Sequence, residues 1–469
     1  MAAEASFQVL VLAAGKGTRM RSSRAKVLHT AFELPLLEHV LRAVRPLAPS
    51  AVTIVVGHQA EQVEQAFADA CLAFVRQSPQ RGTGHAVQTA QAAFAHQPEL
   101  PLLVVSGDTP LLRPETIAAL LAAHTASGAG VTLLTAEIEH AGAYGRVVRS
   151  KTGAVERIVE AGDASREEQG LREINAGTYV FDVPALLSAL SALDDSNAQG
   201  ELYLTDVVGR ISAKGQTVCA VCAQDPSEVL GVNTLAELAQ ASDILRRRRL
   251  EALMAAGVVV EDPASVWVGP NATIEADAVL RPFTMVEGRS HVAGTARVGP
   301  FARLVNCAVE EGAEILDHCL LRDSSIGAGA SIGPFAHIRP ESVVGAKAKV
   351  GNFVELKKTH LGDGSKAPHL SYLGDSTIGT RVNVGAGTIT CNYDGSNKYP
   401  TRIEEGAFIG SNATLVAPVS VGAGAYVAAG SVITEDVPKD ALALGRARQV
   451  VKPGWAGERR ERLARERQR

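Results

Sequence analysis

The sequence has few aromatic residues, few cysteines and no apolar segment long enough to cross a membrane. Phe, Trp and Tyr make up 4% of the 469 residues, and only six cysteines are scattered along the chain. Because no run of 18 or more apolar residues occurs, we expect neither a transmembrane helix nor a membrane partner. Scattered cysteines fit a reducing compartment and the chain starts without a basic leader, so we expect a cytoplasmic protein.

Positive charge is not in excess either, because the chain has 46 Lys and Arg residues and 50 Asp and Glu residues, for a net charge of −4. This balance argues against a nucleic-acid partner. Glycine is plentiful at 44 residues, and 46% of the residues are hydrophobic, which is enough for sizeable cores. The length predicts two or three domains. Sequence patterns divide the chain into a first domain at 1–232, a linker helix at 233–256 and a second domain at 257–469.

Residues 7–230 alternate apolar strands with helical segments. The segments are strands at 8–15, 51–57, 101–108 and 130–138, and helices at 35–44, 60–70, 84–96 and 114–126. This alternation predicts an α/β, Rossmann-like domain with a mostly parallel sheet and helices on both faces. Ligands of such sheets bind at the carboxyl ends of the strands, and glycine and polar residues gather at these ends here.

The segment 233–256 lacks Gly and Pro and has helical apolar spacing, which predicts a linker helix. Its basic run Arg246–Arg249 is expected to form a solvated helix face rather than a binding patch. Cys219 and Cys222 form a C-x-x-C pair on an expected strand, where positions i and i+3 point to opposite faces. We therefore expect ordinary burial for this pair and no metal or redox role.

Beyond residue 260 the apolar period changes to six, with two one-residue slips before Ile326. The recurring residues are Val268, Ile274, Leu280, Val286, Val292, Val298, Leu304, Ile326, Ile332, Ile338, Val344, Val350, Ile378, Val384, Ile403, Ile409, Leu415, Val421, Val427 and Ile433. A fixed short period predicts a solenoid, here a left-handed parallel β-helix of hexapeptide repeats with about 18 residues per coil. The stretches 356–377 and 391–402 depart from the period, and we expect both to be inserted loops on the functional face.

A glycine-rich segment, Leu12–Met20 (LAAGKGTRM), follows the first strand. It matches neither G-x-x-x-x-G-K-[ST] nor G-x-G-x-x-G. Such a turn presents backbone N–H groups that can hold phosphate oxygens, and Lys16 and Arg19 add positive charge. An ordinary strand–helix turn is the alternative.

More polar groups follow in the same region. Lys26 lies just beyond the glycine-rich segment, Gln77 and the run 82–85 (GTGH) form a second loop, and Asp108 ends the third strand. A carboxylate at the carboxyl end of a parallel strand can hold Mg²⁺ through one oxygen. The alternative role for Asp108 is to cap the next helix.

Four motifs, L-A-A-G-K-G-T-R-M, the lysine of K-V-L-H, Q-x(4)-G-T-G-H-A and G-D-x-P-L, resemble those of the sugar-nucleotide pyrophosphorylases. With the hexapeptide repeats attached, residues 7–455 resemble the bifunctional bacterial N-acetylglucosamine-1-phosphate uridylyltransferase/glucosamine-1-phosphate N-acetyltransferase family. The resemblance implies that a sugar 1-phosphate oxygen attacks the α-phosphate of UTP and expels pyrophosphate without a protein nucleophile.

The resemblance also assigns residues to this first site. Lys26, Arg19 and Asp108 are its implied catalytic residues, and Asp108 and Asn233 its implied Mg²⁺ ligands. Asn233 has an alternative role as the cap of the linker helix. The implied nucleotide and sugar contacts are Leu12, Ala13, Ala14, Gly15, Lys16, Lys26, Gln77, Gly82, Thr83, Ser106, Gly107, Asp108, Tyr144, Gly145, Arg146, Glu160, Asn175, Thr178 and Asn233.

The two irregular stretches of the solenoid are rich in Lys, His, Tyr and Asn. Two histidines in a loop are often plain surface, yet hexapeptide solenoids frequently carry acyltransferases, and neutral His can accept an amine's proton near pH 7. The resemblance selects His369 as the general base for direct transfer from acetyl-CoA to glucosamine 1-phosphate; a nucleophilic Cys391 is disfavoured because no activating base lies nearby in the sequence. It assigns the sugar phosphate to Arg339, Lys357, Tyr372, Asn383 and Lys398, and acetyl-CoA to Ala386, Asn392, Tyr393, Ser411, Ala429 and Arg446.

The resemblance further implies a homotrimer through the β-helix, whereas the residues alone indicate only an oligomer. The tail 456–469, with repeated Arg and Glu, is expected to be frayed or disordered. Two alternatives remain open: a single-activity nucleotide-sugar pyrophosphorylase whose β-helix serves regulation or assembly, and a scaffold without activity. The polar residues of the solenoid argue against the first, and the charged residues of the N-terminal site argue against the second.

Overall fold

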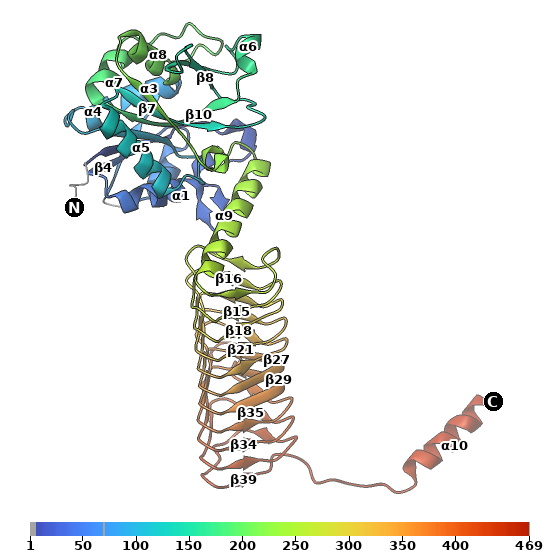
Figure 1. Ribbon diagram of the computed structural model, residues 1–469. Coiled ribbons are helices and arrows are strands. Elements are labelled where there is room, and N and C mark those ends of the chain that lie inside the picture. Colours follow the sequence, from blue (N-terminus) through green and yellow to red (C-terminus); the bar gives the residue numbers. More distant parts are fainter. Residues whose placement is uncertain (1–5, 69–70, 469) are drawn as a thin grey trace. The chain divides into compact units, whose positions relative to one another are not determined.

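A computed structural model describes residues 6–68 and 71–468 of the chain (Figure 1). The chain forms two compact units, Met1–Arg248 and Arg249–Arg469. Each unit has a hydrophobic core of its own, an α/β core in the first and a long solenoid core in the second. The two units are described separately below.

The first unit contains a sheet in the strand order β11-β7-β10-β6-β1-β4-β5. Its strands are β1 (Gln8–Ala13), β4 (Ala51–Val56), β5 (Leu72–Arg76), β6 (Leu102–Ser106), β7 (Val131–Glu137), β10 (Glu173–Phe181) and β11 (Val218–Cys222). All neighbours on this path are parallel except β10, which runs antiparallel to both β6 and β7. The predicted mostly parallel sheet is confirmed. The hairpin of β8 (Arg146–Arg149) and β9 (Val155–Val159) joins it at the edge of β10.

Helices cover both faces of this sheet because its strands are apolar on both sides. The helices are α1 (Leu36–Val44), α2 (Ala60–Ala66), α3 (Thr83–Thr89), α4 (Gln91–Phe94), α5 (Pro114–Ser127), α6 (Arg166–Gln169), α7 (Val183–Leu190) and α8 (Thr205–Ala213). Val9, Val11 and Ala13 of β1 pack into the hydrophobic cluster of α1 and α5, whereas Leu10 packs into that of α3, α7 and α8.

Two predicted helices differ from those in the structure. The helix expected at 60–70 ends at Ala66, and residues 69–70 of that prediction lie outside the described residues. The helix expected at 84–96 is two short helices, α3 and α4, which meet at Ala90.

The predicted linker helix is present as α9 (Leu235–Ala255), but its basic run is not a solvated face. Arg248 donates to the carbonyl oxygen of Leu111 at 2.6 Å and to Asp225 at 2.9 Å. Arg249 donates to the carbonyl oxygen of Ala272 at 2.6 Å. The expectation is therefore wrong for these two residues, because their guanidinium groups donate to backbone carbonyl oxygens of the buried residues Leu111 and Ala272. Arg247 alone of the four is classed as exposed.

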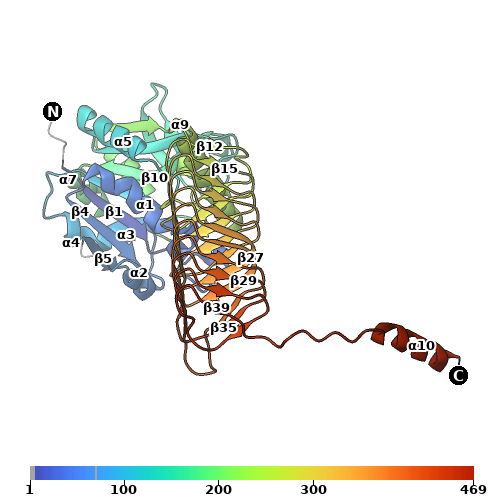
Figure 2. The ribbon, with the colours of Figure 1, turned by 90° about the horizontal axis from the view of Figure 1, so that it is seen from below.

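The second unit is a left-handed parallel β-helix whose short strands stack in successive coils (Figures 1 and 2). Equivalent inward residues pair in register 18 positions apart, as in Val268 with Val286, or 17 apart, as in Val292 with Val309. Nearly all of the predicted inward residues are buried, with Ile274 at the first coils only partly so. The six-residue period therefore identified the fold and the face of each residue correctly.

The stretch 356–377 is not an inserted loop. It belongs to regular coils that comprise β27 (Lys349–Lys357), β28 (His360–Leu361), β29 (Lys366–Gly374) and β30 (Ser376–Ile378). Strands β27 and β29 pair over most of their length and are labelled in Figure 2.

The register through this stretch continues with inward, buried side chains. These are Leu356, Leu361, Ala367, Leu373 and Ile378. Spacings of five, from Leu356 to Leu361 and from Leu373 to Ile378, interrupted the count of six and produced the wrong expectation. The second stretch, 391–402, does contain an insertion between β32 (Ile389–Cys391) and β33 (Thr401–Ile403), closed by a bridge between Tyr393 and Lys398.

One corner of the β-helix, which we call the aromatic corner, carries a ladder of stacked rings. Phe283, Phe301, His318, Phe335 and Phe353 take this position in successive coils, with φ between 55° and 59°. Neighbouring ring centroids are 4.6–5.4 Å apart. The four Phe side chains are 47–58% exposed, so the ladder is an apolar strip on the surface of the single chain.

The tail is helical rather than irregular. Helix α10 (Trp455–Arg467) is exposed along its length, and Arg465 lies within 3.8 Å of Glu461 one turn earlier. The expectation of a frayed or disordered end is wrong for these residues, because alternating Arg and Glu also supply favourable i, i+4 pairs. Within residues 6–68 and 71–468, no helix has the length and apolar character that crossing a bilayer requires.

Candidate functional site

The glycine-rich segment turns sharply at the end of β1. Gly17 has φ of 61°, and a Cβ atom there would lie 2.8 Å from Cβ of Lys26. Glycine is therefore needed for the loop to approach Lys26. The neighbouring strand is tied to the same place, because the Gly107 N–H donates to the carbonyl oxygen of Leu12 at 2.9 Å. Ser106 pairs with Leu12 in register, so the ends of β1 and β6 meet at one edge.

Four predicted residues converge at this edge. The Lys26 ammonium pairs with the Asp108 carboxylate and donates to Oδ1 of Asn233 at 2.6 Å. The same Asn233 oxygen accepts a hydrogen bond from Arg19 at 2.9 Å. The Asp108 carbonyl oxygen accepts from the Val232 N–H at 2.9 Å, which holds the segment before α9 against β6. Groups up to 214 positions apart thus form one cluster of two cations and two side chains whose oxygens accept their hydrogen bonds.

The alternative capping roles of Asp108 and Asn233 are excluded. Helix α5 begins at Pro114, five residues after Thr109, and Arg113 is its N-cap. Helix α9 is capped by Thr234, whose hydroxyl accepts from the Glu237 N–H at 3.2 Å while Glu237 accepts from the Thr234 N–H at 2.9 Å. This reciprocal pair is a capping box, and it leaves the Asn233 side chain to the cluster.

The cluster fits a divalent cation with oxygen ligands. The Asp108 carboxylate and the Asn233 amide oxygen both contact the same Lys26 ammonium, so one cation can reach both. Carboxylate and amide oxygens are hard ligands of the kind that Mg²⁺ accepts alongside phosphate and water. Within the described residues, no group of three or more His, Cys, Asp or Glu side chains is placed to hold a metal by itself.

The second polar loop is held against residues 201–204. The Gln77 amide donates to the carbonyl oxygen of Gly82 at 3.0 Å, and the Thr83 hydroxyl accepts from the Leu204 N–H at 3.0 Å. Gly82 has φ of 102°, and a Cβ atom there would lie 2.5 Å from the Leu202 carbonyl oxygen. The loop is thus tightly fixed, and only glycine fits at its start.

A third group of predicted residues lies beside the β8–β9 hairpin. The Asn175 N–H donates to the carbonyl oxygen of Gly145 at 2.9 Å, and a Cβ atom on Gly145 would lie 3.7 Å from Oε1 of Glu160. Burial raises the pKa of Glu160, and the Thr205 hydroxyl, which donates to it at 3.0 Å, partly offsets this shift. Tyr179, whose hydroxyl accepts from the Asn175 amide at 2.6 Å, and Thr205 were missed from the sequence because their pairing depends on the fold.

Tyr144, Arg146 and Thr178 complete the predicted sugar contacts. The Tyr144 hydroxyl accepts from the Gly231 N–H at 3.1 Å, which links the hairpin to the chain beside Asn233. Burial raises the pKa of Tyr144. Arg146 is buried and donates to the carbonyl oxygens of Tyr144 and Gly142, so it shapes the loop. Thr178 is buried in β10, and Lys16 is exposed in the glycine-rich segment.

On the β-helix, most residues assigned to acetyl-CoA share one column. The Gly387 N–H donates to the Leu370 carbonyl oxygen at 2.8 Å, the Asn412 N–H to Ala386 at 2.7 Å, and the Gly430 N–H to Ser411 at 2.8 Å. A Cβ atom on Gly430 would lie 3.9 Å from Cδ of Arg446. The column therefore runs along the aromatic corner and comprises His369, Ala386, Ser411, Ala429 and Arg446.

Some of the residues assigned to the sugar phosphate form a second group on the next face of the β-helix. Lys357 lies 3.9 Å from Oδ2 of Asp375, and Asn392 donates to the same carboxylate. The Lys357 ammonium lies close to that of Lys398 and lowers the pKa of Lys398, an effect that Asp375 and Tyr372 partly offset. Two neighbouring ammonium groups favour an anionic ligand between them.

The structure also places Arg339, Glu355 and Asn383 relative to this group. Arg339 donates to Glu355 at 2.7 Å, and Glu355 stands beside Tyr372 in register. Asn383 pairs with Lys366, so it lies on the face before the aromatic corner rather than with Lys357. Sequence reasoning missed Glu355 and Asp375, which the coil register brings to the predicted residues.

No disulfide joins any two of the cysteines in the part of the chain that the structure describes. Cys222 is exposed and Cys219 half-buried on β11, and no disulfide joins them. Cys391 is exposed at the end of β32. The expected burial is therefore wrong for Cys222, because β11 is the edge strand of the sheet. The absence of a metal or redox role stays a prediction.

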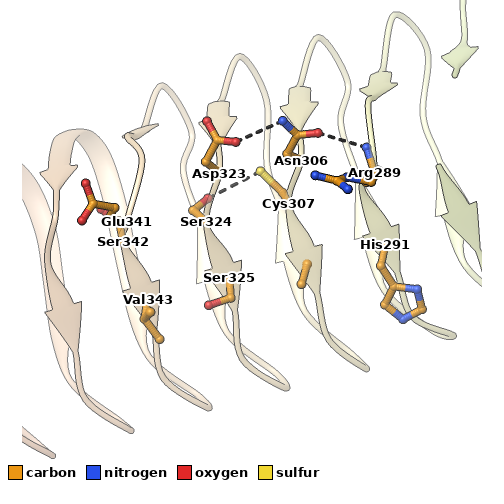
Figure 3. Close-up of a pocket in the computed structure, with 11 residues that line it drawn as sticks. Arg289, His291, Asn306, Cys307, Asp323, Ser324, Ser325, Glu341, Ser342 and Val343 are labelled. Atoms are coloured by element: carbon orange, nitrogen blue, oxygen red, sulfur yellow. Dashed lines mark hydrogen bonds between the residues drawn. The ribbon is translucent and has the colours of Figure 1, made fainter. Parts of the chain in front are cut away.

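A shallow depression of about 380 Å³ lies on the β-helix away from these residues (Figure 3). The Asn306 amide donates to Asp323 at 3.0 Å, and its oxygen accepts from the Arg289 N–H at 3.0 Å. Cys307 and Ser324 are 3.5 Å apart below them. These groups hydrogen-bond to one another from coil to coil, so we interpret this depression as a structural corner of the solenoid rather than a binding site.

Three family models match the chain. They are a MobA-like NTP transferase domain over residues 9–255, a GMPPB C-terminal domain over 263–358, and a hexapeptide repeat of succinyl-transferase over 400–435. A UDP-glucose pyrophosphorylase solved with UDP-glucose overlaps 52% of this chain and 100% of its own, at 17% identity and a TM-score of 0.43, which is too low to inform function.

Curated relatives match nearly the whole length. "Bifunctional protein GlmU" of an Exiguobacterium species (strain ATCC BAA-1283 / AT1b) is 47% identical over 95% of this chain and 98% of its own. The proteins of the same name from Heliobacterium modesticaldum and Koribacter versatilis are 46% and 43% identical over 96% and 98% of this chain, and each match covers 98% of the relative. The chain belongs to the GlmU family of bifunctional proteins.

Membership of the GlmU family identifies the chain as an enzyme with two activities. The N-terminal unit is a uridylyltransferase and the β-helix a glucosamine-1-phosphate acetyltransferase of UDP-N-acetylglucosamine synthesis. The alternatives of an idle β-helix and of an inactive scaffold are therefore wrong.

Proposed function

We propose that the two activities act in sequence on one substrate. The β-helix first transfers the acetyl group of acetyl-CoA to the 2-amine of glucosamine 1-phosphate. The N-terminal unit then transfers a uridylyl group from UTP to the resulting N-acetylglucosamine 1-phosphate and releases pyrophosphate. The observation that carries this proposal is the convergence of Lys26, Arg19, Asp108 and Asn233 at the carboxyl ends of β1 and β6.

The uridylyl transfer needs charge neutralisation rather than a protein nucleophile. A phosphate oxygen of the sugar attacks the α-phosphorus of UTP, and the bond to the β-phosphate oxygen breaks, so pyrophosphate leaves with that oxygen. Lys26 and Arg19 neutralise the phosphates, while backbone groups of the glycine-rich segment position them. Asp108 and Asn233 would hold Mg²⁺, which neutralises phosphate charge when bound.

The sugar is proposed to bind beside the β8–β9 hairpin, and the base of UTP at the second polar loop. Glu160 and Asn175 offer a carboxylate and an amide next to Gly145, whose lack of a side chain leaves room there. Gln77, Gly82 and Thr83 form the fixed loop for the nucleotide.

The acetyl transfer is proposed to use His369 as general base. A ring nitrogen of His369 takes the proton of the substrate ammonium, the amine attacks the thioester carbonyl, the carbon–sulfur bond breaks, and CoA leaves as the thiol after protonation. Lys357, Lys398 and Arg339 would hold the sugar phosphate. The acetyl-CoA column would lie along the aromatic corner, with Asn392 and Tyr393 from the inserted loop nearby.

We also propose a homotrimer formed through the β-helix, working in the cytoplasm. Support comes from the exposure of His369 and from the half-exposed rings of the aromatic corner. A regular apolar strip of this length favours burial against another chain. A monomeric mass in solution with full acetyl transfer would contradict a shared site.

The test is an assay with UTP, acetyl-CoA, Mg²⁺ and glucosamine 1-phosphate, in which free CoA thiol and pyrophosphate are followed together. We expect both products, with pyrophosphate release dependent on acetyl-CoA. Omitting acetyl-CoA and supplying N-acetylglucosamine 1-phosphate should restore pyrophosphate without thiol. Release of neither product would contradict the proposal.

A further inference from the structure

We infer that Asn352 is a positioning residue for acetyl transfer, because its amide oxygen holds the Nδ1–H of His369 and leaves Nε2 as the basic nitrogen. This inference rests on the proposed role of His369 as general base. The two side chains come from successive coils, and Nδ1 of His369 lies 2.8 Å from Oδ1 of Asn352.

The contact selects one form of the ring. A neutral imidazole carries its proton on either nitrogen, and only the form protonated at Nδ1 has a free electron pair at Nε2. An amide oxygen can only accept, so His369 must donate through Nδ1 to it. Asn352 therefore favours the form in which Nε2, the outer nitrogen, can take a proton from a substrate.

The backbone fixes the distance between the two residues. Asn352 of β27 stands opposite His369 of β29 within a run of paired positions. The strands approach closely just before this pair, since a Cβ atom on Gly351 would lie 1.8 Å from the Pro368 carbonyl oxygen. Glycine at 351 is thus required for the pair to come within hydrogen-bond distance.

The residues that follow the pair also restrain it. Phe353 and Leu370 both have positive φ, 57° and 42°, and each begins the aromatic corner of its coil. The buried Ser371 hydroxyl donates to the His369 carbonyl oxygen at 2.9 Å. These contacts hold the His369 backbone, so Asn352 determines the orientation of the ring and which of its nitrogens carries the proton.

The immediate neighbours of His369 carry no charge. Asn352 flanks it on one side, and the next coil places Ala386 on the other. Charged or titratable side chains on β27 and β29 begin three positions away, at Lys349, Lys366, Glu355 and Tyr372. A charge introduced at 352 would therefore act on the ring without a competing partner at contact distance.

The test compares Asn352→Ala with Asn352→Asp in the full chain. For Asn352→Ala we expect kcat of acetyl transfer to fall about tenfold, with KM for both substrates nearly unchanged. This is the scale seen when a functional histidine loses the hydrogen-bond partner that orients its ring. Asn352→Asp keeps an acceptor of the same size, so it should retain most of the activity. Because a carboxylate stabilises the imidazolium, the acidic limb of its pH–rate profile should move to higher pH.

Uridylyl transfer by each variant is the internal control, and Thr377→Ala, an exposed position on another face, is the matched variant. Unchanged acetyl transfer in Asn352→Ala would overturn the inference. Equal losses in the Ala and Asp variants without a pH shift would also overturn it, because the amide would then be a donor or a purely structural group. Failure of the proposed base itself is distinguished by His369→Ala, which would then keep full acetyl transfer.

Discussion

The sheet edge and the aromatic corner assemble chemical groups by different rules. At the sheet edge, Arg19, Lys26, Asp108 and Asn233 come from distant parts of the first unit and converge on one point. Along the aromatic corner, the functional positions recur about one coil apart and form a line rather than a cluster. A converging fold completes a site within one chain, whereas a repeating fold supplies an extended surface.

The two regions also differ in how closely a carboxylate pairs with their cations. At the sheet edge, the Asp108 carboxylate pairs directly with Lys26, and the neutral amide oxygen of Asn233 accepts a hydrogen bond from Arg19. On the β-helix, Lys357 and Lys398 lie together, and Asp375 compensates them only in part. In the proposed function, metal and phosphate replace the internal ion pair of the first site, and the second site gains an anion.

The largest effect should follow from Asp108→Ala. Removing the carboxylate takes away the proposed metal ligand and the partner of Lys26, so uridylyl transfer should fall about 10³-fold. Acetyl transfer by the same variant should be unchanged, because Asp108 belongs to the other unit. Pyrophosphate release and thiol release from separate substrate pairs measure the two effects.

Glu115→Ala is the matched control for that experiment, since Glu115 is an exposed carboxylate at the start of α5. It should leave both activities near the wild-type level. If Asp108→Ala retained full uridylyl transfer, the converging cluster would not be the catalytic centre and the contrast between the regions would disappear.

The reciprocal experiment is His369→Ala, with an expected loss of acetyl transfer of about 10²-fold, the scale of general-base catalysis. Uridylyl transfer from preformed N-acetylglucosamine 1-phosphate should not change. His360→Ala removes an exposed histidine of the same coil on another face and should be neutral. Equal losses in the two histidine variants would indicate a general disturbance of the coil instead of base catalysis.

The same contrast explains what could be predicted from the sequence. The six-residue period identified inward positions such as Val286 and Ile338, because each inward residue is repeated by its neighbours. Strand-end motifs identified Asp108, because a polar residue after a buried strand must lie at the sheet edge. Both signals are local, so neither needs knowledge of pairing.

The contacts that were not predicted from the sequence depend on strand register or on hydrogen-bond acceptors far away in the chain. Asn352 and Asp375 become neighbours of His369 and Lys357 only because one coil is 17 residues long here, a number set by the five-residue spacings that obscured 356–377. Arg248 was expected in solvent because Leu111, its acceptor, lies 137 positions away.

A smaller effect is expected from Lys357→Met, which removes one of the paired ammonium groups. The KM for glucosamine 1-phosphate should rise about tenfold, because one charge-assisted hydrogen bond to phosphate is lost. Release of Lys398 from its positive neighbour offsets part of the loss. Lys358→Met is the matched control, since Lys358 is exposed at the adjacent corner and pairs with Glu341 at 3.7 Å. An unchanged KM in Lys357→Met would mean that the sugar phosphate binds elsewhere on the β-helix.

The smallest effect concerns Glu160, whose pKa is raised chiefly by burial. A raised pKa means that the folded protein binds this proton more tightly than the unfolded chain does. The stability linked to it is therefore full below the ordinary glutamate range and is lost as pH rises through the raised pKa. Glu160→Gln removes this loss, so its melting temperature should exceed that of the wild type at pH 8, by no more than about 2 °C.

The gain should shrink strongly at pH 4, where the carboxyl is mostly protonated in both states of the wild type. Scanning calorimetry of the full chain at both pH values measures the difference. Glu156→Gln, which changes an exposed carboxylate on strand β9 just before Glu160, should show no such trend. A gain that is equal at pH 8 and pH 4 would show that burial does not perturb Glu160. Glu160 would then be as open to solvent as His369 of the β-helix, and burial of the proposed functional groups would no longer distinguish the two regions.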